Sequence, residues 1–178
     1  MKLAHHCLVA LPSQSCNTFE RSVVYVFKHD SRGALGIVIN HITSSNFGDV
    51  MNHLKIDLKD NAFRRKVVLS GGDCQKELGF VIHSPVGNWQ TSEVVTREVA
   101  VTTSKDILLS IAQSELEVDD FIFSLGCSRW TAGQLEEEVA KNRWWVCPAD
   151  PLIMFETSVA DRWRLAMKKL GVRRVHQI

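Results

Sequence analysis

The chain has 178 residues, of which 45% are hydrophobic and 23% charged, and its formal net charge is +1 at pH 7. This composition is typical of a globular protein in water, and the small net charge excludes a strong overall attraction to nucleic acid or to an acidic membrane. The longest apolar runs fall far short of the ~18 residues that a membrane-spanning helix needs, so we expect a single domain over 1–178 with no membrane association.

Eight segments are predicted as strands because they are rich in β-branched and aromatic residues: 7–11, 22–27, 35–40, 67–70, 78–83, 94–102, 121–125 and 144–147. The runs SVVYVF and LGIVIN are almost entirely apolar, which indicates strands that are covered on both faces. The segment HDSRG between them is short and contains a glycine, and we expect it to form a hairpin loop.

Helices are predicted between these strands, each with a capping residue at its start. They are NFGDVMNHL after Asn46, SKDILLSIAQ after Ser104, DPLIMF after Asp150 and SVADRWRLAMKKLG after Ser158. The last of these ends with two lysines and Gly171, which is typical of a helix terminus. Hairpins followed by mixed strands and helices indicate the α+β class.

The segment GCSRWTAGQLEEEV (126–139) partly matches the G-x-S-x-G turn that exposes a catalytic serine in hydrolases. In place of the last glycine, however, the chain has Trp130. Thr131 and Gln134 have the spacing of a capping box, and Trp130 and Leu135 that of a hydrophobic staple. We therefore interpret the segment as the start of a helix rather than as a site for a nucleophilic Ser128.

The five cysteines are odd in number and form no C-x-x-C pair: Cys7, Cys16, Cys74, Cys127 and Cys147. This spacing predicts neither a disulfide framework nor a zinc site, and it favours a reducing cytoplasm. No metal and no cofactor is predicted. A buried structural role is expected for each thiol, with redox sensing through Cys127 or Cys147 as an alternative.

A set of motifs over nearly the whole chain resembles the AlgH family, also called YqgE-like: RSVVYVFKHDSRGALGIVIN (21–40), LSGG (69–72), LGFVIHSP (78–85), VTTSKD (101–106), LG…W.AGQLEEEVAKNRWW (125–145), PAD…F (148–155) and RW (162–163). The resemblance implies a cytoplasmic bacterial protein of one α+β domain. Its bifurcated mixed sheet would fold into a pseudo-barrel with flanking helices. The family carries a label as a transcriptional regulator of exopolysaccharide synthesis, taken from one member, and has no established catalytic residues.

The chain departs from the usual family pattern at several positions. Cys127 and Ser128 stand where relatives usually have tyrosine and alanine, so a mechanism shared by the family cannot depend on either side chain. Lys28, Asp73 and Leu78 replace a glutamate, a proline and an arginine. A common ligand site that used the glutamate or the arginine would therefore be altered here.

The positions that match the family supply the candidate ligand or partner site: Arg21, Asn40, Gly71, Gly72, His83, Ser104, Trp130, Gln134 and Arg162. Most of the polar ones fall at strand ends and helix starts, where backbone groups need partners. We expect Arg162 to pair with a carboxylate. Packing explains His83 and the Gly71-Gly72 turn least well, because glycines let a ligand approach the backbone.

These observations favour a non-enzymatic regulatory or interaction protein with a protein or small-molecule partner. Direct DNA binding is not expected, because basic residues cluster only at 64–66 and at Lys168, Lys169, Arg173 and Arg174, without a helix-turn-helix. The alternative is a small-molecule or anion-binding protein, or an enzyme. Its cleft would be formed by Gly71-Gly72, His83 and the 126–134 loop.

Overall fold

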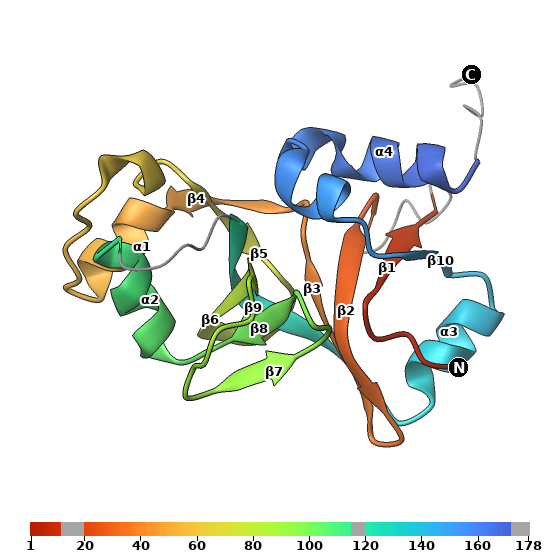
Figure 1. Ribbon diagram of the computed structural model, residues 1–178. Coiled ribbons are helices and arrows are strands. Elements are labelled where there is room, and N and C mark those ends of the chain that lie inside the picture. Colours follow the sequence, from red (N-terminus) through yellow and green to blue (C-terminus); the bar gives the residue numbers. More distant parts are fainter. Residues whose placement is uncertain (12–19, 115–119, 172–178) are drawn as a thin grey trace. The chain divides into compact units, whose positions relative to one another are not determined.

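The computed structural model describes residues 1–11, 20–114 and 120–171 (Figure 1). They form two compact units: unit 1 comprises Met1–Asn40 and Arg129–Ile178, and unit 2 comprises His41–Ser128. Each unit combines strands with helices, which confirms the α+β class. A single domain over 1–178 stays a prediction. No described helix is both long and apolar enough to cross a membrane.

Where the structure describes unit 1, its sheet has four antiparallel strands in the order β10–β1–β2–β3: β1 His6–Ala10, β2 Val23–Asp30, β3 Gly33–Val38 and β10 Trp144–Pro148. The first five residues of β2 are all buried, as its unbroken apolar run predicted. The expected hairpin between β2 and β3 is confirmed, with Asp30 paired to Gly33.

Two α-helices accompany this sheet, α3 Gln134–Ala140 and α4 Arg162–Lys169 (Figure 1). The segment predicted to be helical after Ser158 begins with a 3₁₀ turn, η3 Val159–Asp161, and continues as α4. The DPLIMF segment forms a short π-helix, η2 Leu152–Glu156, whose N-cap is Pro151 and not the predicted Asp150, although the Asp150 side chain accepts the Leu152 N–H at 3.0 Å. The indole N–H of Trp163 donates to the Ala10 carbonyl at 3.0 Å and attaches α4 to β1.

Two tryptophans of unit 1 share one carboxylate. The indole N–H groups of Trp130 and Trp144 donate to the same oxygen of Glu138, at 3.1 and 2.8 Å. Their rings meet edge to face with centroids 6.3 Å apart, and both side chains are buried. Because a buried indole N–H needs an acceptor, Glu138 allows both large rings to enter the core beside Leu135.

The start of α3 differs in part from the predicted capping box. The N-cap is Gly133, whose φ of 76° lies in the left-handed region, and not Thr131. The Gln134 side chain accepts the Thr131 N–H at 3.0 Å, as predicted, but the Thr131 hydroxyl donates to the same oxygen. Only one arm of the box is therefore present, while Trp130 and Leu135 are both buried as a staple requires.

The described residues of unit 2 form six strands: β4 Ile42–Asn46, β5 Val67–Ser70, β6 Cys74–Ser84, β7 Ser92–Val94, β8 Ala100–Thr102 and β9 Asp120–Thr131, whose last three residues belong to unit 1. The order β9–β6–β8–β7 is antiparallel, and β5 pairs with β9 in parallel and with β4 antiparallel.

The structure differs from the predictions for three segments of the chain. The segment 94–102 forms two strands, because the Thr96 hydroxyl accepts the Val99 N–H and stabilises a turn. Strand β4 was missed because its sequence, ITSSN, is mostly polar. The expected 126–134 loop is largely strand, since β9 continues to Thr131.

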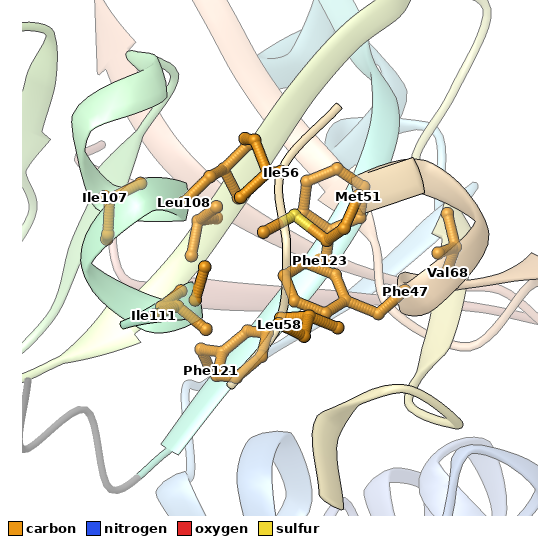
Figure 2. Close-up of a cluster of buried hydrophobic side chains, with 12 residues drawn as sticks. Phe47, Met51, Ile56, Leu58, Val68, Ile107, Leu108, Ile111, Phe121 and Phe123 are labelled. Carbon is orange, nitrogen blue, oxygen red and sulfur yellow. The ribbon is translucent and has the colours of Figure 1, made fainter. Parts of the chain in front are cut away.

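The core of unit 2 lies between this sheet and two helices, α1 Phe47–His53 and α2 Lys105–Ala112. Figure 2 shows side chains from both helices pointing toward Phe121 and Phe123 of β9. The Phe47 ring packs on these two rings, with centroids 5.3 and 5.4 Å apart. The predicted N-cap Asn46 is confirmed and forms a full capping box with Asp49.

We expect replacement of Glu138 by leucine to lower the free energy of unfolding by about 2–4 kcal/mol, because two buried indole N–H groups would lose their acceptor. The matched control is Glu137→Leu on the same helix, which removes an exposed ion pair with Lys141 and should cost less than about 1 kcal/mol. Urea unfolding followed by circular dichroism measures both. Equal losses in the two variants would show that the shared carboxylate has no special role.

Candidate binding pocket in unit 2

The glycines of the LSGG motif bring two backbone segments of unit 2 into direct contact. Gly71 donates its N–H to the Leu125 carbonyl at 2.9 Å. A Cβ atom added at Gly72, where φ is +147°, would lie 2.3 Å from the Cys127 carbonyl oxygen. One added at Gly126, where φ is +79°, would lie 2.8 Å from the Gly72 carbonyl oxygen. Gly72 and Gly126 are therefore required by packing between the segments 71–72 and 125–127.

This contact also explains Ser128. Its hydroxyl donates to the Gly71 carbonyl at 3.1 Å, and the residue is only 4% exposed. A nucleophilic serine needs a neighbouring base and access to a substrate. Ser128 is instead a hydrogen-bonding partner of the glycine turn, consistent with the interpretation of this segment as structural.

Beside the glycine contact, β6 bulges away from β9. Cys74 is paired with Cys127 and Gly79 with Leu125, so the four residues 75–78 of β6 stand against Gly126 alone. Gln75 has a φ of 50°, which begins the irregular stretch. The bulge places Lys76, Glu77 and Leu78 outside the regular sheet, with the two charged side chains exposed.

A pocket of about 640 Å³ lies between this bulge, α1 and the first turns of α2. Its apolar lining comes from Val50 and Leu54 of the α1 region, Leu108 of α2, and Leu78, Phe123 and Leu125 of the sheet. Val50, Leu54 and Leu125 are partly exposed and pack against the core cluster drawn in Figure 2. The pocket is thus an opening onto the hydrophobic core, and its size is in the range of small-molecule sites.

Gly79 contributes to this pocket by having no side chain. A Cβ atom at position 79 would lie 2.9 Å from two atoms of the Phe123 ring. Both residues line the pocket. A glycine therefore lets the Phe123 ring and the bulge occupy the same wall without a clash.

Polar groups surround the apolar floor. Three basic side chains, Lys76, Lys105 and His53, and two carboxylates, Asp49 and Glu77, line the pocket and are all exposed. Asp49 accepts the Asn46 N–H at 2.9 Å in the capping box of α1. Lys76 lies 3.5 Å from Asp73, but both side chains are more than 60% exposed (65% and 73%), so their attraction is weak.

His83, a predicted site residue, is fully buried and bonded at both ring nitrogens. Nδ1 donates to the Pro85 carbonyl at 2.9 Å, and Nε2 lies 2.7 Å from the Thr102 hydroxyl, which also meets Ser92. Burial lowers the pKa of His83, and the bond to Pro85 offsets part of this effect. Burial favours the neutral imidazole, and the ring has no exposed surface for a ligand.

The predicted cleft of Gly71-Gly72, His83 and the 126–134 loop is not formed within unit 2. His83 is paired with Phe121, whereas Gly71 is bonded to Leu125, four residues further along β9. This separation is about 13 Å at the rise of an extended strand. The glycine pair lies beside 125–128, and His83 is at the other end of β9.

Three further residues of the predicted site, Asn40, Arg21 and Arg162, make their contacts within unit 1. The Asn40 side chain accepts the Val23 N–H at 2.8 Å and donates to the Arg21 carbonyl at 2.7 Å. The Arg21 guanidinium lies 5.6 Å from the centroid of the Trp163 ring, within range of a cation–π contact. Arg162 donates to the carbonyls of Ile39 and Ile153 instead of the expected carboxylate, and burial lowers its pKa to about 10.

The remaining candidates are also bonded within their unit. Ser104 begins α2 as predicted, yet its hydroxyl donates to Asp106 at 2.6 Å and accepts the Thr91 N–H, without bonding a helix N–H. Trp130 is held by Glu138, and the Gln134 amide donates to the other oxygen of Glu138 at 3.1 Å. These positions connect loops and helices to the strands.

Three cysteines, Cys7, Cys127 and Cys147, are buried, which disfavours a reactive thiolate. Cys127 is 1% exposed. Burial raises the pKa of Cys147 and of Cys7, which stands opposite Cys147 in the β1–β10 register. Cys16 lies outside the described residues. Among the described residues no three His, Cys, Asp or Glu side chains gather as metal ligands.

We expect the free energy of unfolding to decrease as the pH is lowered, and we expect His83 to cause part of this decrease. In the unfolded chain a histidine takes up a proton near pH ~6.5, whereas the folded state keeps His83 neutral to a lower pH. The stabilisation is therefore complete above about pH 6.5 and is lost as the pH falls toward the lower folded pKa. Urea unfolding between pH 5 and 8 should show a steeper loss in the wild type than in His83→Gln. Parallel curves would contradict this role.

The sequence profile of the AlgH-like family matches residues 7–175. A UPF0301 protein of Chromobacterium violaceum is 38% identical over 171 residues, covering 96% of this chain and 91% of the relative. A UPF0301 protein of Xanthomonas axonopodis pv. citri is 41% identical over 170 residues, covering 96% and 90%.

Solved structures agree with this relationship. The solution structure of the AlgH protein from Pseudomonas aeruginosa matches with a TM-score of 0.81 and 36% identity, covering 96% of this chain and 90% of that one. A crystal structure of a protein from Corynebacterium diphtheriae has a TM-score of 0.76 at 17% identity, covering 95% and 87%, and shows likeness of fold alone. The profile match over most of the chain and the identity to these relatives establish that the chain belongs to the AlgH-like family.

Proposed function

We propose that this protein is a non-enzymatic regulatory protein of the cytoplasm that acts by binding, and that the pocket between α1, α2 and the β6 bulge is its binding site. The observation that carries this proposal is the contrast between two groups of residues. The polar residues of the family motifs are bonded to the fold, whereas three apolar side chains of the pocket, Val50, Leu54 and Leu125, remain partly exposed.

The pocket has the properties of a binding site without those of a catalytic one. Catalysis by a nucleophile requires a hydroxyl or thiol within hydrogen-bonding distance of a base. In the described part of the chain, no hydrogen bond joins the pocket histidine, His53, to Ser45 or Thr103. The apolar floor with a few polar groups at its edge favours binding of a partner molecule over its conversion.

The distribution of basic residues does not favour regulation through direct DNA binding. Within the described residues, the basic run 64–66 does not present a uniform cationic face, because the Lys66 ammonium lies 4.1 Å from the centroid of the Phe121 ring. The predicted second basic cluster is described only at Lys168 and Lys169, since Arg173 and Arg174 lie outside the described residues. We propose that the protein responds to a bound molecule and does not read a nucleic acid.

The uncharged fluorophore N-phenyl-1-naphthylamine tests the pocket. We expect saturable binding at one site, weakened about tenfold by Leu54→Ser, because this change removes apolar surface from the pocket. Leu109→Ser on α2 is the matched control, since Leu109 is 44% exposed and does not line the pocket. Fluorescence titration measures both affinities, with thermal unfolding as a check of folding. Absence of saturable binding, or equal weakening by both changes, would refute the site.

A separate experiment tests the proposal that the protein is not an enzyme. Incubation of the purified protein with a bacterial metabolite extract, followed by mass spectrometry, should leave the extract unchanged. A conversion that disappears in His53→Ala, while the variant keeps its affinity for the fluorophore, would show that the pocket is an active site.

A further inference from the structure

We propose that the occupant of this pocket is an amphipathic organic acid, with an apolar chain or ring on the floor and its acidic group beside Lys105 and Lys76. This inference rests on the proposed function and specifies the ligand class of the same site. Three properties of the pocket support it: the apolar floor, the free donors at its edge and the state of its carboxylates.

The floor can bury an apolar body of moderate size. Val50, Leu54 and Leu125 form a partly exposed surface over the core, and Leu108 and Phe123 lie beneath it. A pocket of about 640 Å³ accommodates a small molecule rather than a folded partner. Removal of such surface from water would provide most of the affinity.

The edge offers more free donors than acceptors. Lys105 is the first residue of α2, it is exposed, and no ion pair involves it in the described part of the chain. Lys76 is held only by its weak pair with Asp73. The Thr103 hydroxyl and the His53 imidazole add further donor groups.

The carboxylates of the edge are less available to a ligand. Asp49 already accepts a backbone N–H from Asn46, and it lies in the first turn of α1, where the helix dipole favours its charge. Glu77 is therefore the one lining carboxylate without such a bond among the described contacts, against two lysines. Asp49 keeps its negative charge, but the dipole of α1 partly offsets it, so Lys76 and Lys105 together outweigh Glu77 for a ligand at this edge and favour an acid.

Calorimetric titration of the full chain with decanoate and with uncharged decanamide, both below their aggregation concentrations, tests this inference. We expect decanoate to bind about five- to tenfold more tightly, and this preference should shrink as salt is raised. Lys105→Glu should abolish the preference, whereas Lys59→Glu, an exposed lysine of unit 2 outside the pocket, should leave it unchanged. Gly79→Ala should weaken both ligands alike, because its methyl group would displace the Phe123 ring.

The outcomes separate this inference from the proposed function. Equal affinities for decanoate and decanamide, both weakened by Leu54→Ser, would overturn the acidic ligand and leave the pocket as a binding site. Tight decanoate binding that is insensitive to Lys105→Glu and to Leu54→Ser would place the acid elsewhere and also overturn it. Failure of decanoate, decanamide and the fluorophore alike would remove both proposals.

Discussion

The close contact between the backbones at Gly72 and Gly126 is the constraint on which the candidate site depends. Side chains at these positions would collide with carbonyl groups of the opposite segment, so the sequence is restricted to glycine there. Next to this contact, β6 leaves the pairing with β9 after Cys74 and rejoins it at Gly79, after the four-residue bulge at 75–78. The bulge then forms one wall of the pocket. The LSGG motif suggested a ligand site at the glycines themselves. In the structure its glycines instead hold the backbone contact that lies beside the bulge of β6.

Most of the regular structure could be predicted from periodicity and capping. The unbroken apolar run of β2 and the Asn46 cap of α1 both appear in the structure as expected. Strand β4 could not be predicted, because its residues are mostly hydroxyl and amide side chains and their strand conformation is imposed by pairing with β5. The predicted N-cap of α3, Thr131, was wrong. Gly133 is the N-cap instead, and its left-handed conformation could not be read from the capping-box spacing.

The candidate site could be predicted from the sequence less well than the fold. The family motifs direct attention to polar residues, and the structure shows His83, Asn40 and Arg162 bonded to neighbouring strands and carbonyls. The pocket residues come from separate segments, some of them within the family motifs, such as Leu78, Lys105 and Leu125, and no local pattern predicts the bulge that lies beside them. The structure alone reveals that Leu54, directly after α1, and Leu125, within β9, are apolar residues that the core does not fully enclose.

Because the pocket floor is continuous with the core of unit 2, occupancy and folding are thermodynamically linked. A molecule that binds only the native state at ten times its dissociation constant would add about 1.4 kcal/mol to the free energy of unfolding. In a cell, a change of this size alters the fraction of chains open to proteases and with it the steady-state amount of protein. Under the proposed function, the level of a bound metabolite would thereby influence the amount of this protein in the cell.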